Sequence, residues 1–252
     1  MFLIERHQAI LTMLNNVKSI TVKELSKNLQ TGEATIRRDL AKLETSGLLK
    51  RTHGGAVLRD AFQGEIPLTV RETENEEQKR IIASHGSRLI RDGQFIIMDS
   101  SSTTLRMIPY LRKIDNLTVL TNGAKTAVDL ANLPHIKVYP TGGLLREKSL
   151  SLIGQKANSF LQDFNGDILF FSCRALSMEK GLSDFDEQEA ILRKEMMRAS
   201  KRSVLLCDHS KFDESSFCRI GPVRCVDTII TDKKPSSRWV EYLEAQNIEL
   251  IY

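Results

Sequence analysis

A run of hydroxyl side chains follows an apolar segment, residues 95–98, that is typical of a buried strand. The candidate residues are Asp99, Ser100, Ser101, Ser102, Thr103 and Thr104. If a helix begins within this run, hydroxyl groups and backbone amides without helical partners stand together at its positive end. Such an arrangement binds phosphate groups. Taken alone, the run could equally be an elaborate N-cap for that helix.

Polar, glycine or cationic residues also follow other predicted strands. They are Thr121, Asn122, Gly142, Gly143, Arg146 and Lys211, the last within the sequence Asp-His-Ser-Lys at 208–211. Ligands of open parallel sheets bind beyond the carboxyl ends of the strands. The strand ends together therefore predict a site for a small, polyhydroxylated anion such as a sugar phosphate, although Lys211 alone would be a surface lysine.

Two acidic residues lie at or before the start of a long predicted helix, residues 187–200. Asp184 and Glu187 could contact the hydroxyl groups of a sugar, or could simply complement the positive end of this helix.

The elements that would position these residues alternate along 76–252, where short apolar strands are separated by amphipathic helices. This alternation favours an α/β unit with a mostly parallel sheet covered on both faces. No P-loop, dinucleotide-binding or zinc-protease motif occurs, and the four cysteines lack metal-ligand spacing. We therefore expect no cofactor, no metal ion, reduced thiols and a cytoplasmic location without a membrane span.

Positive charge is concentrated at the start of the chain. Residues 1–59 contain ten Lys or Arg residues against five Asp or Glu residues, a net charge of +5, whereas the whole chain carries +4. A basic segment attached to a nearly neutral body is typical of a chain whose one end meets a polyanion.

A helix with a basic outer face is predicted between a turn at 30–33 and Gly47. Ile36, Leu40 and Leu43 share one side of it, and Arg38 points away from that side. A helix that begins at Thr21 with a capping box precedes it, and Gly47 is placed to end it. Small residues around a central arginine suit a helix that enters the major groove of DNA, although a solvated helix face is the simpler alternative.

The segment at 48–58 is predicted to form a basic hairpin with a turn at 52–55, whose cations and glycines approach phosphates. The candidate DNA-binding residues of the helix and the hairpin are Thr35, Arg37, Arg38, Lys42, Lys50, Arg51, His53, Gly54 and Gly55.

The sequence "TIRRDLAKLETSGLLKRTHGGA", residues 35–56, resembles the winged helix-turn-helix of the DeoR family of bacterial regulators. The resemblance continues through the hydroxyl run, the later strand ends and "DHSKF" at 208–212, and so covers nearly the whole chain. It implies an effector domain similar in fold to ribose-5-phosphate isomerase, a phosphorylated sugar or sugar acid as effector, and a homo-oligomer, either dimer or tetramer. The family often has glycine where Ser102 stands, so a side chain there is expected to crowd the phosphate or reshape the loop.

The predicted organisation is a winged helix-turn-helix domain at 1–58, a linker at 59–75 and an effector domain at 76–252. The predicted function is a transcriptional regulator, most simply a repressor, that leaves double-stranded operator DNA when a sugar phosphate binds. An activator is equally compatible with the sequence, because the position of the operator relative to the promoter decides whether the bound regulator represses or activates transcription. An enzymatic alternative also remains, since Asp99, Asp184 or Glu187 could supply the carboxylate base of a sugar-phosphate isomerase.

Overall fold

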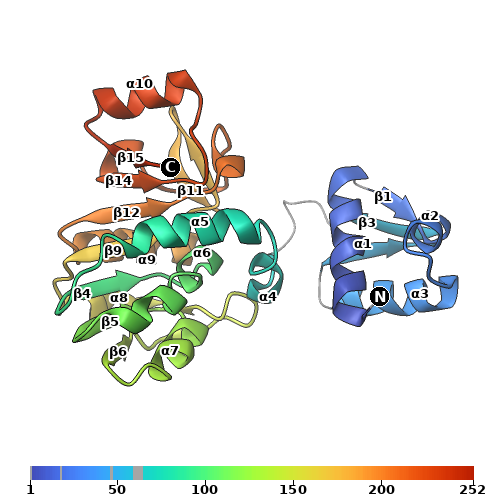
Figure 1. The fold of residues 1–252 in the computed structure, drawn as a ribbon, viewed down its shortest axis with the longest axis horizontal. Helices are drawn as coiled ribbons and strands as arrows, with labels where there is room; N and C mark the ends of the chain where they lie inside the picture. Colours follow the sequence, from blue (N-terminus) through green and yellow to red (C-terminus); the bar gives the residue numbers. More distant parts are fainter. Residues whose placement is uncertain (1, 18, 46–47, 59–64) are drawn as a thin grey trace. The chain divides into compact units, whose positions relative to one another are not determined.

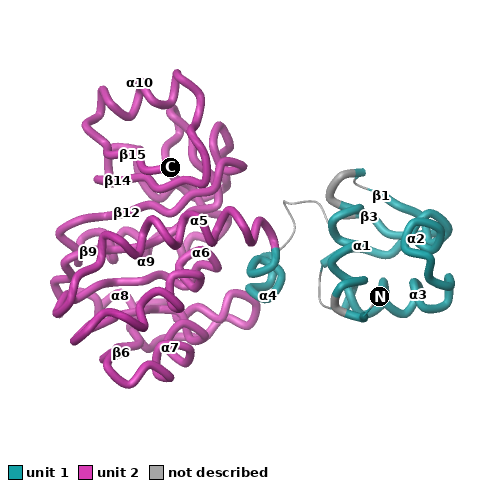
Figure 2. The backbone as a smooth tube through the Cα atoms, viewed as in Figure 1, with its two compact units in different colours: residues 1–73 teal, residues 74–252 magenta. Residues whose placement is uncertain are grey.

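The chain folds into two compact units, residues 1–73 and 74–252 (Figure 2). The computed structural model describes residues 2–17, 19–45, 48–58 and 65–252. Gly47 and residues 59–64, the first part of the predicted linker, lie outside the described residues. The boundary between the units falls inside that predicted linker, which also contains a helix that the sequence analysis missed, α4 (Leu68–Arg71).

The first unit contains three helices and a small antiparallel sheet before α4 (Figure 1). Its elements are α1 (Leu3–Val17), β1 (Ser19–Thr21), α2 (Val22–Asn28), α3 (Glu33–Thr45), β2 (Leu49–Thr52) and β3 (Gly55–Leu58). The capping box predicted at Thr21 and Glu24 is present and begins α2. The predicted hairpin is β2–β3, and β1 adds a third strand to it, in the order β1-β3-β2.

Gly55 is buried between two strands of this sheet. A Cβ atom built on Gly55 would lie 2.1 Å from the backbone oxygen of Ile20 in β1. The neighbouring Gly54 is exposed, and a Cβ atom there would meet nothing within 4 Å. Packing against β1 is a structural reason for glycine at position 55, and the prediction that both glycines bring the backbone close to DNA stays a prediction.

The second unit is built on a seven-stranded sheet in which every strand pairing is parallel. The strands, in spatial order, are β15 (Glu249–Ile251), β14 (Thr228–Ile230), β12 (Ser203–Leu206), β9 (Ile168–Phe171), β4 (Phe95–Met98), β5 (Leu117–Thr121) and β6 (Ile136–Pro140). All seven were predicted from the sequence.

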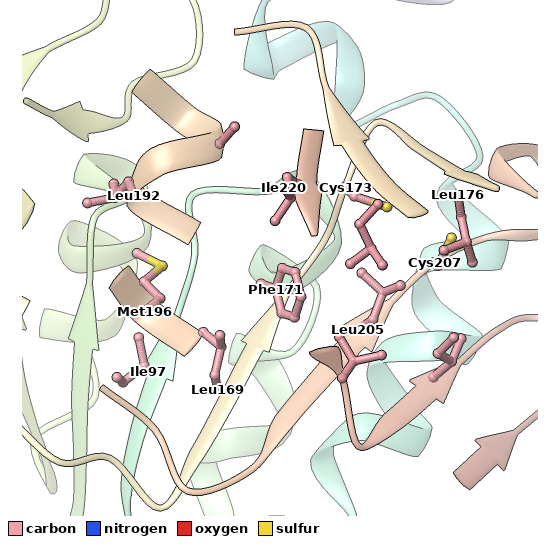
Figure 3. Close-up of a cluster of buried hydrophobic side chains, with 14 of the residues drawn as sticks. Ile97, Leu169, Phe171, Cys173, Leu176, Leu192, Met196, Leu205, Cys207 and Ile220 are labelled. Carbon is pink, nitrogen blue, oxygen red and sulfur yellow. The ribbon is translucent and has the colours of Figure 1, made fainter. Parts of the chain in front are cut away.

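Helices cover both faces of this sheet, as predicted (Figure 1). One face carries α5 (Glu76–Ser87), the 3₁₀ helix Ile108–Lys113 and α7 (Ala124–Ala131). The other carries α8 (Gln155–Leu161), α9 (Glu187–Arg198) and α10 (Ser237–Ala245). Successive strand residues alternate between the two cores, so Phe170 packs on the first face and Phe171 on the second, in the cluster of Figure 3.

Short antiparallel strands are the elements that the sequence analysis missed in this unit. The hairpin β7 (Leu144–Leu145) and β8 (Leu152–Ile153) follows β6. A second sheet joins β10 (Ala175–Ser177), β11 (Gly181–Asp184) and β13 (Cys218–Gly221). These strands are only two to four residues long, which is too short for an alternating pattern to stand out.

The helix predicted after Thr103 is much shorter than expected. It comprises α6 (Ser102–Leu105), and the chain continues in 3₁₀ geometry at Ile108–Lys113, where Pro109 stands at the start. A four-residue helix has little aligned dipole, so the predicted electrostatic contribution of the helix to anion binding is reduced.

The two adjacent glycines of the hairpin offer a matched test of this packing. Gly55→Ala is expected to destabilise the β1–β3 pairing, because its methyl group would overlap the Ile20 backbone, whereas Gly54→Ala is expected to leave it unchanged. Hydrogen–deuterium exchange of peptides from β1 and β3 in the full chain measures both. Equal exchange in the two variants would contradict the structural role of Gly55.

Candidate functional site

The first unit presents α3 as an exposed basic helix on a small core. Ile36, Leu40 and Leu43 are buried in that core, as the spacing predicted. The opposite face carries Arg38 and Lys42, both exposed. A helix fixed on one side and cationic on the other can lie in the major groove while its core contacts stay intact.

One residue of α3 breaks this division, because Asp39 is only 2% exposed although it is charged. Arg6 on α1 donates to it through Nε and Nη2, at 2.5 and 3.2 Å, and His7 Nε2 lies 3.2 Å from Asp39 Oδ1. Burial alone would raise the pKa of Asp39, but the hydrogen bonds and charges of Arg6 and His7 outweigh it and lower the pKa. The ion pair therefore ties α3 to α1, which the sequence analysis missed because Asp39 stands among surface charges.

Two of the predicted DNA-binding arginines are paired with acids of their own unit. Arg37 Nη2 lies 3.2 Å from Glu33 Oε2, and Arg51 Nη1 lies 3.9 Å from Glu44 Oε2. Both pairs are about half exposed, so each contributes little and can exchange for a phosphate contact. Arg38 makes no ion pair with any described residue, which leaves it available for a base edge.

The remaining predicted DNA-binding positions lie on the same two elements. Thr35 is half-buried near the start of α3, while Lys50 in β2 and His53 and Gly54 in the turn are exposed. The structure thus places the predicted cations of the helix and of the hairpin on one small unit.

In the second unit, Asp99 joins the ends of β4 and β9 to helix α9. Its Oδ1 accepts from the amide of Ser101 and the hydroxyl of Thr104, both at 3.0 Å. Its Oδ2 accepts from the amide of Ser172, directly after β9, at 3.1 Å, and from Arg193 Nε at 3.3 Å. Ser172 was missed, although the rule that strand ends form the site would have indicated it.

Arg193 on α9 is buried and is surrounded by three carboxylates. Its Nη1 lies 3.2 Å from both Asp184 Oδ2 and Glu189 Oε2, in addition to its contact with Asp99. Burial alone would lower the pKa of Arg193, but the three carboxylates raise it, so the guanidinium stays charged. Burial raises the pKa of Glu189, and the charge of Arg193 and the hydrogen bond from Ser151 oppose that rise.

The acidic residues predicted before α9 divide into one that joins this cluster and one that does not. Asp184 contacts Arg193, whereas Glu187 is exposed on the first turn of α9. Glu189, two positions later, takes the place predicted for Glu187, and it also accepts from the Ser151 hydroxyl. The prediction for Glu187 is corrected, because the helix turns its side chain towards solvent.

The hydroxyl run combines both alternatives that the sequence left open. Ser101 is the N-cap of α6, and Thr104 bonds within the loop, so these two hydroxyls are structural. Ser100 Oγ accepts from Asn122 Nδ2 at 3.4 Å. Within the described ranges, the backbone amides of Ser102 and Thr103 have no hydrogen-bond acceptor, as an anion cradle requires. Ser102 lies in ordinary helical geometry, so the absence of glycine there strains nothing.

The strand end after β5 reaches the same cluster through Asn122, whereas Gly143, after β6, packs beside β8. Thr121 is structural, since its hydroxyl accepts from the amide of Gly123, but Asn122 is 1% exposed and its Oδ1 has no partner among the described residues. Gly142 and Gly143 both have positive φ, and a Cβ atom on Gly143 would lie 2.5 Å from Ile153 O. The unpartnered oxygen of Asn122 is therefore a candidate acceptor for a sugar hydroxyl.

Two predicted cations are held by acids. Arg146 Nη1 lies 2.6 Å from Asp186 Oδ1, and its guanidinium stands over the ring of Phe185. Lys211 Nζ donates to Ser172 Oγ at 2.8 Å and lies 3.8 Å from Asp208 Oδ2. Because Ser172 also binds Asp99, the structure brings Lys211 into the cluster around the hydroxyl run.

The described residues provide no further reactive centre. No group of three or more His, Cys, Asp or Glu residues within the described ranges could hold a metal ion. The cysteines Cys173, Cys207, Cys218 and Cys225 are free thiols. Among the described helices, none combines the length and the apolar character that crossing a lipid bilayer requires.

Comparison with known proteins decides the family. Residues 6–62 match the DeoR-like helix-turn-helix domain, and residues 74–233 match the DeoR C terminal sensor domain. The chain belongs to the DeoR family of transcriptional regulators. These matches confirm the family predicted from the sequence. They also confirm the prediction that the chain is a DNA-binding transcriptional regulator.

Relatives match this DeoR-family chain over nearly its whole length. YulB of Bacillus subtilis (strain 168), named as an uncharacterized HTH-type transcriptional regulator, is 38% identical over 99% of this chain and 96% of YulB. The HTH-type transcriptional regulator GolR of Listeria innocua is 36% identical over 93% of this chain and 92% of GolR. A solved D-ribose-5-phosphate isomerase covers 55% of this chain and 55% of its own at 16% identity and a TM-score of 0.42, which carries no argument about activity.

The Asp39 ion pair gives the DNA-binding unit a pH-dependent stability. Because the folded pKa of Asp39 is lowered, its contribution is present above the unfolded pKa of about 3.9 and is lost as the pH falls through the folded value. Asp39→Asn is expected to lose about 1.5–3 kcal/mol of stability at neutral pH, the usual net contribution of a hydrogen bond to a charged group. The loss should shrink in acid.

Hydrogen–deuterium exchange of peptides from α1 and α3 in the full chain, measured at several pH values, reports this loss. Glu33→Gln is the matched control, since it breaks an exposed ion pair on the same helix. A destabilisation by Asp39→Asn that is the same at neutral and acidic pH would contradict the lowered pKa.

Proposed function

We propose that this DeoR-family regulator represses a carbohydrate-use operon and leaves its operator when a phosphorylated sugar or sugar acid binds. The observation that carries the proposal is the position of Lys211, whose Nζ is one hydrogen bond from Ser172 and therefore two from Asp99. An ammonium group, two amides without acceptors and the Asn122 oxygen meet at the carboxyl edge of one parallel sheet.

The chemistry of these groups favours a phosphorylated polyol over other small molecules. The Lys211 ammonium and the amides of Ser102 and Thr103 donate to phosphate oxygens. Asn122 Oδ1 accepts from a hydroxyl group, as does Asp184, whose Oδ1 otherwise accepts only from the neighbouring amide of Phe185 among the described residues. Repressor names among the relatives, such as the HTH-type transcriptional repressor GlcR of Bacillus subtilis, support the proposed direction of control.

We further propose that the edge binds its ligand without converting it. An isomerase needs a carboxylate free to move a proton between two carbons. Asp99, Asp184 and Glu189 are all held by Arg193, and Glu187 is exposed and outside the cluster. Purified protein is therefore expected to leave ribose 5-phosphate unchanged.

The proposed DNA contacts follow from the exposed cations of α3 and the hairpin, presented by a homo-oligomer, either dimer or tetramer, to repeated half-sites. Loss of Arg38 is expected to weaken binding most, since no described acid holds it. Arg38→Ala should cost about 1–3 kcal/mol of operator binding, the usual value of a bidentate base contact. Loss of a phosphate contact alone would weaken all sequences equally and lower the salt dependence.

Fluorescence anisotropy with a duplex selected by the wild-type chain from a random pool measures this effect. Arg219→Ala is the matched control, because it removes an equal charge from an exposed position in the second unit. Unchanged affinity and unchanged sequence preference in Arg38→Ala would remove Arg38 from the recognition surface.

The proposed effector site is tested by Lys211→Gln and Thr103→Val. Both variants should still bind the selected duplex, and Lys211→Gln should weaken binding of the phosphorylated ligand by about 10- to 150-fold, the equivalent of a charged hydrogen bond of about 1.5–3 kcal/mol. Lys233→Gln is the control for an exposed lysine.

A thermal-shift panel of glucose 6-phosphate, fructose 1-phosphate, ribose 5-phosphate and the corresponding free sugars supplies the measurement. A ligand at about 100 times its Kd adds roughly 2.7 kcal/mol of stability, which is readily seen. If both site variants respond to the phosphorylated sugars as the wild type does, the site lies elsewhere.

A further inference from the structure

The chain enters the second unit through a buried lysine. Glu74 is the first residue of this unit, directly after Thr73, the last residue of the DNA-binding unit. Its backbone oxygen accepts a hydrogen bond of 2.6 Å from Nζ of Lys79 on α5, a residue that is only 5% exposed. A buried ammonium group requires negative partners around it. The point where the linker ends is therefore held by a charge in the interior of the second unit.

Asn75 makes a second attachment at the same point. It adopts the left-handed conformation, with φ of 49°, immediately before α5 begins. Its Nδ2 lies 3.4 Å from both Asp208 Oδ1 and Ser210 Oγ, which follow β12. Asn75, at the start of the second unit, thus contacts the segment that also contains Lys211.

Asp208 is placed between Lys211 and Asn75. It is 1% exposed, accepts from the amide and hydroxyl of Ser210, and lies 3.8 Å from Lys211 Nζ. Burial alone would raise its pKa, but Lys211, the Ser210 hydrogen bonds and the charge of Lys79 outweigh burial and lower the pKa. One buried carboxylate therefore contacts both a lysine of the proposed effector site and the residue that directly follows Glu74.

We propose that Asp208 couples the effector site to the linker by sharing its carboxylate between Lys211 and the side-chain amide of Asn75. This inference rests on the proposed function, because it requires a phosphorylated ligand at Lys211. A phosphate group competes with Asp208 for the Lys211 ammonium. When the Lys211 ammonium turns to the phosphate, Asp208 interacts more strongly with Asn75. The start of α5, where Lys79 also holds Glu74, is then held differently.

The proposal gives the ligand a physical means to act on the DNA-binding unit. A ligand shifts a conformational equilibrium only through contacts that differ between the two states. Here the differing contact is the Lys211–Asp208 pair, and the element that it biases is the entry segment, residues 74–79. Asn75 and Lys79 are positioning residues in this scheme, since neither is placed against the ligand.

Four variants separate the coupling from binding. Lys79→Met removes the charge and Lys79→Arg keeps it, while Asn75→Ala removes both the amide and the left-handed preference and Asn75→Gly removes only the amide. Operator affinity is measured by anisotropy with and without glucose 6-phosphate, fructose 1-phosphate or ribose 5-phosphate, and ligand affinity is measured by calorimetry.

In the wild type, the ligand is expected to weaken operator binding by about 5- to 150-fold, the usual range of allosteric coupling. Lys79→Met and both Asn75 variants should bind operator alone and ligand alone with Kd values within about threefold of the wild type. The coupling factor, which is the ratio of the operator Kd with ligand to the Kd without it, should fall towards one in these variants. Lys79→Arg should retain most of the coupling. If all four variants couple as the wild type does, the proposal is wrong although the proposed function stands.

A wild-type chain that binds none of these ligands, or binds one without any change in operator affinity, overturns both proposals together. Because Lys79→Met removes a buried group and could unfold the entry segment, a second measurement uses the wild type alone. Hydrogen–deuterium exchange of residues 74–80 is compared in inorganic phosphate and in chloride at equal ionic strength. Altered protection there supports the coupling, and unaltered protection while residues 99–104 become protected contradicts it.

Discussion

A guanidinium group removed from water must be surrounded by negative charge, and the carboxyl edge of the large sheet is organised around this requirement at Arg193. Asp99 reaches it from the end of β4, Asp184 from the end of β11 and Glu189 from α9 itself. Two of these acids also fix a neighbouring loop: Asp99 binds the hydroxyl run and Ser172, and Glu189 binds the Ser151 hydroxyl. Removing the central charge would leave buried carboxylates that repel one another, so the loops of the edge depend on Arg193.

This arrangement reconciles a cluster rich in carboxylates with the anionic ligand that we propose. All three acids are paired with the Arg193 guanidinium. Lys211 and the free amides of the hydroxyl run stand at the same edge but outside the Arg193 contacts. At this edge, the charges paired with Arg193 are structural, whereas Lys211 is available to the proposed ligand.

The DNA-binding unit solves a similar problem with fewer residues. Asp39 and Arg38 are consecutive, yet one is buried against α1 and the other is exposed. Because a helix turns about 100° per residue, neighbours in sequence face different surroundings, and α3 can be anchored by charge on one side and present charge on the other. The pairs of Glu33 with Arg37 and Glu44 with Arg51 are exposed and weak, so they do not prevent exchange with phosphate.

The sequence predicted the elements whose periodicity is strong and the residues that directly follow them. All seven parallel strands, α3 with its buried stripe, the capping box of α2 and the meeting of Asp99 with Lys211 near one edge belong to this class. What it missed depends on contacts distant along the chain. Arg193 stands in a polar helix and is indistinguishable there from a surface arginine, and Glu187 and Glu189 differ only in the direction that α9 gives them. The packing of Gly55 against Ile20 in β1 was missed because the two residues are 35 positions apart in the sequence.

The central claim is that an anion at the strand ends and an operator at α3 bind to a single coupled molecule. Thermodynamic linkage requires that each ligand change the affinity for the other by the same factor. The most direct measurement is the Kd of the phosphorylated sugar, by calorimetry, for the free chain and for the chain saturated with operator duplex. We expect the chain saturated with operator duplex to bind the sugar more weakly than the free chain does. The factor should equal that by which the sugar weakens operator binding. A Kd that is identical with and without the duplex would contradict the central claim.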